Sequence, residues 1–234
     1  PPTLVKNMVI TGFGGGEYGV RGAIVALDQA TGKEIWRTHT IPVGNEKNAD
    51  TWKGDSGKTG GGAAWFIGSY DPKLNLVYYG TSNPGPWSAI VRGNDSSDVG
   101  KFTNLYTASV VALNPDTGNI VWHYQFTPGD DHDWDANEGV ILADRVIDGK
   151  PRKLLLQANR NGFFYALDRT DGKFLFAKPF VKQTWNNGFD ANGKPIWNPN
   201  TNATPDGTVV YPSLVGGTNW QSPSYDAASG TYFL

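Results

Sequence analysis

The stretch Ala26-Leu-Asp-Gln-Ala-Thr-Gly-Lys-Glu-Ile-Trp36 decides the fold, because it recurs twice along the chain with the same spacing. It returns as Ala112-Leu-Asn-Pro-Asp-Thr-Gly-Asn-Ile-Val-Trp122 and, more weakly, as Ala166-Leu-Asp-Arg-Thr-Asp-Gly-Lys-Phe-Leu-Phe176. In each copy, apolar residues precede a turn built on Asp or Asn and Gly, and an aromatic residue follows. Asp and Asn side chains cap turns and glycine accepts positive φ, so each copy predicts a strand–turn–strand hairpin.

A second pattern alternates with the first. Ser69-Tyr-Asp-Pro-Lys-Leu-Asn-Leu-Val-Tyr78 is matched by Ser224-Tyr-Asp-Ala-Ala-Ser-Gly-Thr-Tyr232, and no useful helical periodicity stands out. Repeated short strands with glycine-rich turns predict an all-β propeller or solenoid with negligible helix. The alternative is a β-sandwich whose hairpins are similar by chance, and three copies at one spacing disfavour it.

The composition excludes several classes of protein. Lys plus Arg (20) is below Asp plus Glu (22), so a basic nucleic-acid binder is not expected. Cysteine is absent, which excludes disulfides and thiolate metal ligands within these residues. No apolar run is long enough for a transmembrane helix, so no membrane span is expected in this segment. Both ends read as strands, and we expect residues 1–234 to be part of one domain of a longer chain.

Five further motifs accompany the repeats in a fixed order. They are Gly14-Gly-Gly-Glu-Tyr-Gly-Val-Arg-Gly22, Gly60-Gly-Gly-Ala-Ala-Trp65, Asn83-Pro-Gly-Pro-Trp87, Asn159-Arg-Asn-Gly162 and Gly216-Gly-Thr-Asn-Trp220. Repeats and motifs together resemble the pyrroloquinoline quinone (PQQ) dependent alcohol dehydrogenases of the methanol and ethanol dehydrogenase type. The resemblance covers nearly the whole chain. It implies an eight-bladed β-propeller of which about half, the central part, is present.

The first three motifs hold candidate ligands for a cofactor and a metal ion. Glu17 is a hard oxygen donor suited to calcium or a similar cation, and the resemblance assigns it to the metal. Free N–H groups at Gly15 and Gly16 could hold a carboxylate of the quinone. The resemblance places Trp65 beneath the quinone and makes Asn83 a metal ligand. Without it, Glu17 reads as a solvated loop residue, Trp65 as core and Asn83 as a turn cap.

Acidic residues are most closely spaced in the segment Thr127-Pro-Gly-Asp-Asp-His-Asp-Trp-Asp-Ala-Asn-Glu138. Their carboxylates repel one another unless a cation or several hydrogen-bond donors neutralise them. The family carries its catalytic aspartate here, in a Pro-x-Asp-x-Trp-Asp pattern. A gapless alignment implies that Asp133 is the base, with His132 in place of the Trp, whereas alignment on Trp-Asp selects Asp135.

In the gapless register, Asp135 stands where lanthanide-type members carry a second aspartate. A lanthanide ion is therefore expected, with Ca²⁺ as the alternative, and its ligands would be Glu17, Asn83, Asp133 and Asp135.

The last two motifs complete the implied site. Arg160 lies where the family arginine contacts the quinone carbonyl oxygens, and a fixed cation there would stabilise charge that develops during reduction. Asn219 and Trp220 would contact the cofactor from another blade. The family's adjacent cysteine pair is absent from these residues. Ala63 replaces a threonine of methanol-oxidising members, which makes methanol a less secure substrate.

The resemblance implies an enzyme of the periplasm. It would oxidise a small primary alcohol to an aldehyde, reduce PQQ, and pass electrons to a cytochrome c; a homodimer is one assembly that it allows. The first alternative is a non-catalytic PQQ-like propeller scaffold of the outer-membrane assembly type, which would share the repeats but not the set Glu17, Asn83, Asp133 and Arg160. The second is a PQQ-dependent sugar dehydrogenase.

Overall fold

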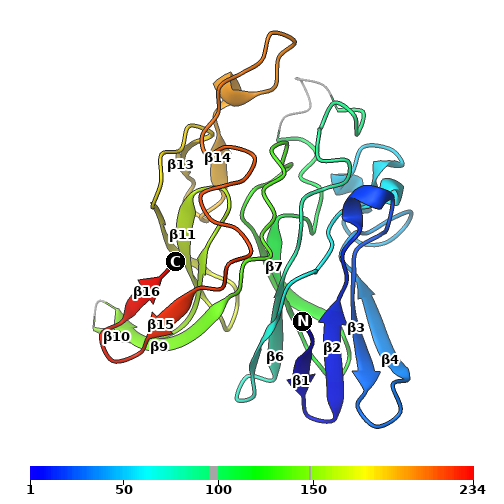
Figure 1. The fold of residues 1–234 in the computed structure, drawn as a ribbon, viewed down its shortest axis with the longest axis vertical. Coiled ribbons are helices and arrows are strands. Elements are labelled where there is room, and N and C mark those ends of the chain that lie inside the picture. The colour runs from blue at the N-terminus through cyan, green and yellow to red at the C-terminus, as the bar shows by residue number, and fades with distance from the viewer. Residues whose placement is uncertain (95–99, 148) are drawn as a thin grey trace.

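The computed structural model describes residues 1–94, 100–147 and 149–234, and within these ranges it is built of β-strands without any α-helix (Figure 1). The first blade consists of β1 (Thr3–Val5), β2 (Met8–Gly12), β3 (Ala23–Asp28) and β4 (Glu34–His39). The second consists of β5 (Ser69–Asp71), β6 (Leu76–Gly80), β7 (Ser109–Leu113) and β8 (Ile120–Gln125). The third consists of β9 (Ile141–Ile147), β10 (Lys150–Ala158), β11 (Phe163–Asp168) and β12 (Phe174–Pro179).

Two hairpins follow the third blade. They are formed by β13 (Asn186–Phe189) with β14 (Pro195–Trp197) and by β15 (Ser224–Asp226) with β16 (Thr231–Phe233). Short 3-10 helices lie in the loops: η1 (Gly16–Tyr18), η2 (Ala49–Thr51), η3 (Ser56–Thr59) and η5 (Pro199–Thr201). No helix among the described residues is long and apolar enough to cross a membrane.

Each blade is an antiparallel sheet whose four strands pair in sequence order, the arrangement of a propeller blade. The inner strands of the second blade, β6 and β7, are buried along their whole length, whereas the last strand of the first blade, β4, is largely exposed. The prediction of an all-β propeller with negligible helix is confirmed.

The recurring Thr-Gly motif forms the hairpin between the third and fourth strand of each blade, as predicted. The motif's glycine donates its N–H to the carbonyl of the Asp or Asn four residues earlier, at 2.8 Å in all three copies (Gly32 to Asp28, Gly118 to Asn114, Gly172 to Asp168). Each glycine has a positive φ, between 69° and 77°. The pairing register also shifts at the Ala-Leu step of each copy, which marks the same β-bulge in every blade.

The aromatic residue that ends the motif joins one blade to the next. The Trp36 indole N–H donates to the Pro115 carbonyl at 2.7 Å, and a Cβ placed on Gly118 would lie 2.7 Å from its ring. Trp122 packs in the same way against Gly172, where a Cβ would lie 2.5 Å from the ring. The tryptophan and the glycine therefore recur together because the ring occupies the space that a side chain would need.

Apolar side chains fill the space between blades. Aromatic residues dominate the core between the second and third blades: Tyr78, Trp122, Tyr124, Phe126, Trp134, Tyr165 and Trp185. Smaller aliphatic residues dominate the core between the first and second blades, including Val5, Ile10, Ile24, Val77 and Val111.

The topology brings distant loops together. Within each blade the strands alternate in direction, so β2, β4, β6, β8 and β10 all end at one edge, which lies at the top of Figure 1. The Thr-Gly hairpins lie at the opposite edge. Residues that follow the even-numbered strands are consequently neighbours, although long stretches of sequence separate them.

Candidate active site

The predicted site residues lie in the loops at this shared edge. Glu17 is on η1 after β2, Trp65 follows β4, Asn83 follows β6, and Arg160 follows β10. The acidic loop, residues 127–138, follows β8.

Asp135 connects three of the loops. Its Oδ1 accepts the backbone N–H of Asn83 at 2.8 Å, and its Oδ2 accepts the indole N–H of Trp65 at 2.9 Å. The Asn83 amide group in turn donates to a carboxylate oxygen of Glu17. Asp135, Asn83, Trp65 and Glu17 thus form one hydrogen-bonded group.

Arg160 lies between the two aspartates for which the alignments compete. Its Nη1 is 3.3 Å from Asp135 Oδ2, and its Nη2 is 3.8 Å from Asp133 Oδ2. Nη2 also donates to the Leu214 carbonyl at 2.8 Å. The buried Nε finds no hydrogen-bond partner in the described part of the chain, so one donor of this guanidinium is left for another group.

The two aspartates have different surroundings. The side chain of Asp133 is 29% exposed, against 9% for Asp135, and its backbone is left-handed with φ of 59°. Burial, and then the charge of Asp135, raises the pKa of Asp133 to about 6. Burial also raises the pKa of Asp135, although Arg160 opposes this shift. Asp133 is therefore the accessible carboxylate that titrates close to neutral pH, as a general base requires, while Asp135 is held by its neighbours.

Negative charge is in excess at this edge. Asp133 and Asp135 face the guanidinium of Arg160, Glu17 interacts with the buried Arg92, and both Asp135 and Glu17 raise the pKa of Asp133. Hard oxygen donors with uncompensated charge suit a hard cation. As they stand, however, no three His, Cys, Asp or Glu side chains among the described residues are close enough to hold one metal ion.

The amide of Asn83 directs its nitrogen at Glu17, whereas a metal ligand must offer its oxygen. The ligand set Glu17, Asn83, Asp133 and Asp135 accordingly stays a prediction.

The glycine-rich turn before Glu17 packs against the neighbouring loop. The Gly16 carbonyl accepts the N–H of Gly61 at 3.0 Å, and a Cβ on Gly16 would lie 3.1 Å from the Gly61 Cα. Gly15 has φ of 94° and immediately precedes η1. Gly14 lies beside Trp65, since a Cβ there would be 3.8 Å from the tryptophan Cβ. The turn and the tryptophan are neighbours, and their assignment to the cofactor stays a prediction.

Asn219 and Trp220 lie on a segment whose backbone contacts Arg160. The Gly217 N–H donates to the Arg160 carbonyl at 2.9 Å. Asn219 donates to the Val215 carbonyl at 2.9 Å, and Trp220 is 60% exposed. Their assignment to the cofactor stays a prediction.

Three buried ionisable residues beside the site, Asp130, Glu138 and Arg92, have no role assigned from the sequence. Burial raises the pKa of Asp130 to about 7, and burial raises that of Glu138 well above its ordinary value. Arg92 is buried too, with burial lowering its pKa, and it donates to three carbonyls. Of the three, only Asp130 could have been found from the sequence, because it occupies the first Asp of the Pro-x-Asp-x-Trp-Asp pattern. A polar loop arginine or glutamate looks exposed until the fold is known.

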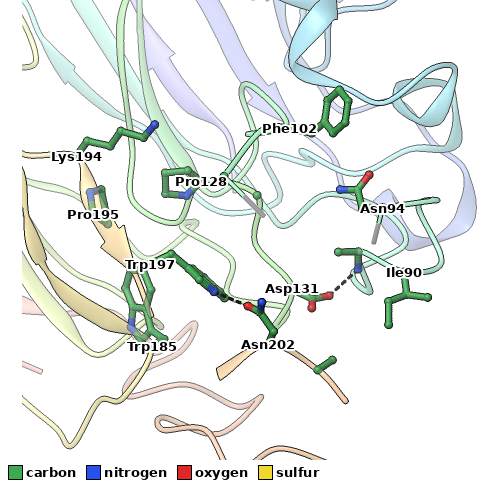
Figure 2. A pocket seen from close by; sticks show the side chains of 14 residues that line it. Ile90, Asn94, Phe102, Pro128, Asp131, Trp185, Lys194, Pro195, Trp197 and Asn202 are labelled. Atoms are coloured by element: carbon green, nitrogen blue, oxygen red, sulfur yellow. Dashed lines mark hydrogen bonds between the residues drawn. The ribbon is translucent and has the colours of Figure 1, made fainter. Parts of the chain in front are cut away.

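A cavity of about 430 Å³ borders the acidic loop. Figure 2 shows Trp185 and Trp197 on one side of it and Ile90 and Asp131 on the other. The Asp131 carboxylate accepts the N–H of Ala89 at 2.5 Å. Asp131 lines this cavity but Asp133 does not, so the cavity is distinct from the hydrogen-bonded group around Asp135.

Comparison with known proteins agrees with this architecture. The family described as PQQ: glucose/ethanol/alcohol dehydrogenase, beta-propeller domain, matches residues 1–188. Quinohemoprotein alcohol dehydrogenase ADH IIB of Pseudomonas putida is 44% identical over 245 residues, which cover 100% of this chain and 35% of the relative. The lanthanide-dependent methanol dehydrogenase of Methylorubrum extorquens is 35% identical over 260 residues, covering 98% of this chain and 42% of the relative.

A solved structure gives the same result. That of quinohemoprotein alcohol dehydrogenase ADHIIG from Pseudomonas putida HK5 superposes with a TM-score of 0.91 and 43% identity, covering 99% of this chain and 35% of that one. The chain therefore spans roughly a third to two fifths of the relatives it matches. The family match covers most of the chain, and the three blades carry the family's propeller repeats. The chain belongs to the PQQ-dependent glucose, ethanol and alcohol dehydrogenase family and forms part of its β-propeller domain.

Proposed function

We propose that the protein containing this chain oxidises small primary alcohols to aldehydes, using PQQ and a bound metal ion. One observation carries the proposal: Asp133 is the more exposed of two carboxylates that face the buried guanidinium of Arg160, and the other, Asp135, is buried beside it. The relatives are alcohol dehydrogenases by name. A non-catalytic scaffold gains nothing from so many buried like charges, which oppose folding.

The residues present fit both absent groups chemically. The unpartnered Nε of Arg160 is a buried donor suited to a quinone oxygen, and the glycine-rich turn at Gly14 lies beside Trp65. Glu17, Asp133 and Asp135 are hard oxygen donors with too little positive charge around them. We therefore assign PQQ to Trp65, Arg160 and the turn at Gly15 and Gly16, with Asn219 and Trp220 as further contacts. We assign the metal ion to Glu17, Asn83, Asp133 and Asp135.

The protein's own groups have distinct tasks in this reaction. When bound, the quinone accepts a hydride and the metal ion polarises it. Asp133 accepts the proton of the alcohol hydroxyl, because it is the more accessible of the two aspartates beside Arg160. Arg160 stabilises the negative charge that develops during the transfer. Asp135 keeps Asn83 and Trp65 in place through its two hydrogen bonds.

The identity of the metal rests on Asp135. A third carboxylate beside Glu17 and Asp133 supplies the extra negative charge that a trivalent ion neutralises, so we propose a lanthanide, with Ca²⁺ as the alternative. One relative is a lanthanide-dependent methanol dehydrogenase. The periplasm as the compartment, a cytochrome c as the electron acceptor, and a homodimer complete the proposal. Residues 1–234 would be part of one PQQ-binding propeller domain.

The test is reconstitution of the full-length protein without metal or cofactor. PQQ is added with either La³⁺ or Ca²⁺, and reduction of an artificial acceptor is followed with primary alcohols and with glucose. The proposal requires turnover of a primary alcohol that depends on both PQQ and the metal. Turnover of glucose alone would identify a sugar dehydrogenase. A protein that binds no PQQ would be a scaffold.

A further inference from the structure

We propose that Asp130, together with Arg92, is a positioning residue that holds the base Asp133 in its reactive place. The inference rests on the proposed function, because it concerns the residue to which we assign proton removal. Two sets of contacts carry it, one made by the side chain of Asp130 and one made by its main chain.

The side chain of Asp130 holds the peptide groups on both sides of Asp133. It is fully buried, its Oδ1 accepts the N–H of His132 at 3.1 Å, and its Oδ2 accepts the N–H of Trp134 at 2.9 Å. Asp133 itself has φ of 59°, in the left-handed region that costs an L-residue about 1 kcal/mol. The two hydrogen bonds thus fix the base in a backbone conformation that it would otherwise tend to leave.

The main chain of Asp130 is bound to the loop of Asn83. The Arg92 Nη2 donates to the Asp130 carbonyl at 2.8 Å, while Nη1 donates to the Pro86 carbonyl at 2.8 Å and the Trp87 carbonyl at 2.6 Å. Arg92 is buried, so water does not replace these bonds easily. The arginine therefore joins the loop that carries Asn83 to the loop that carries Asp133.

This arrangement needs a carboxylate at position 130. Both oxygens accept a backbone N–H, and an asparagine has only one acceptor oxygen. In Asp130→Asn the amide NH₂ would face one of the two N–H donors, which would stay buried without a partner. Asp133 would then lose its fixed position. A displacement of about 1 Å at a reacting group can lower a rate about 100-fold.

The experiment compares Asp130→Asn with Asp131→Asn in the full-length holoenzyme. Asp131 is the adjacent residue, and its bond from the Ala89 N–H can be kept by an amide oxygen, so the second variant matches the change in charge and shape. The turnover per bound PQQ, the KM and the kinetic isotope effect with ethanol and 1,1-dideuterated ethanol are measured. PQQ is counted by absorbance, and the crystal structures of the metal-free and cofactor-free variants give φ at position 133.

We expect Asp130→Asn to lower kcat per bound PQQ about 10- to 100-fold, with KM within about threefold of wild type. The isotope effect should increase because hydrogen transfer becomes slower than the later steps, and position 133 should leave the left-handed region. Asp131→Asn should stay within about twofold of wild type in kcat. Arg92→Lys should likewise lower kcat and increase the isotope effect. This variant tests the inference if Asp130→Asn does not fold.

Two outcomes would overturn the inference. One is an Asp130→Asn enzyme with wild-type kcat per bound PQQ and wild-type isotope effect. The other is a loss of activity that follows the loss of bound PQQ while the isotope effect is unchanged, which would show a structural role alone. Asp133→Asn is measured in parallel. If that variant keeps its activity, the proposed base is wrong, and the failure belongs to the proposed function instead.

Discussion

The backbone N–H of Asn83 donates to the Asp135 carboxylate at 2.8 Å, although the two residues are 52 positions apart in the sequence. This bond links the loop after β6 to the loop after β8. Asp135 is buried and also accepts the Trp65 indole N–H, so its side chain is held in one position. The bond thereby separates the tasks of the two neighbouring aspartates, because Asp133 keeps the more exposed carboxylate.

The separation predicts different effects of the same substitution. Asp133→Asn should lower kcat of the full-length enzyme at least about 1000-fold, because a neutral amide cannot accept the hydroxyl proton. Asparagine tolerates the left-handed backbone, so the fold and the bound PQQ should be retained. Steady-state kinetics with PQQ quantified by absorbance would check this. An active Asp133→Asn enzyme with an inactive Asp135→Asn enzyme would transfer the role of base to Asp135.

Asp135 also predicts the choice of metal. A trivalent ion needs more negative charge than Ca²⁺, so the wild-type enzyme should be most active with La³⁺, and Asp135→Ala should lose that preference. Activity after reconstitution with each ion measures the ratio. If wild type and variant are equally active with Ca²⁺, Asp135 does not select the metal.

The contact between blades predicts a difference between two glycine substitutions. Gly32→Ala should cost about 1 kcal/mol, because φ is 69° but nothing lies within 4 Å of the new Cβ. Gly118→Ala has similar strain and also forces a Cβ to 2.7 Å from the Trp36 ring, which should add about 1–3 kcal/mol. Urea unfolding of the full-length protein measures both. Equal losses would mean that Trp36 moves aside without cost.

The raised pKa values predict how stability depends on pH when metal is absent. Asp130 and Asp133 have folded pKa values of about 7 and about 6, above the ordinary value of 3.8. Between these limits the folded protein binds more protons than the unfolded protein. The stability that these two groups contribute is therefore fully present below about pH 4, and it is lost as the pH rises toward 7.

The melting temperature of the metal-free, full-length protein should therefore fall by about 5 °C between pH 5 and pH 7.5. Asp130→Asn should reduce this decrease, because the variant removes one of the titrating groups. Calorimetry across this range is the measurement. A melting temperature that rises with pH would contradict the excess of buried negative charge.

The sequence alone was enough to predict the blade and its turn. The Asp or Asn, the Gly and the aromatic residue of the motif act over a few neighbouring residues, through a capped turn and a positive φ, so their spacing already specifies a hairpin. The motif order was likewise the basis for predicting that Glu17, Asn83 and Arg160 belong to one site, and that prediction still awaits a test with bound cofactor and metal.

The tertiary structure decided what the spacing left open. Asp133 and Asp135 are the same residue type two positions apart, and only the packing of other loops buries one and leaves the other accessible. Arg92 and Glu138 resemble solvated loop residues in the sequence, and they are buried because distant strands end beside them. The burial and the pKa of these side chains, and the pairing of remote loops, depend on contacts between residues far apart in the chain. A local sequence pattern does not specify those contacts.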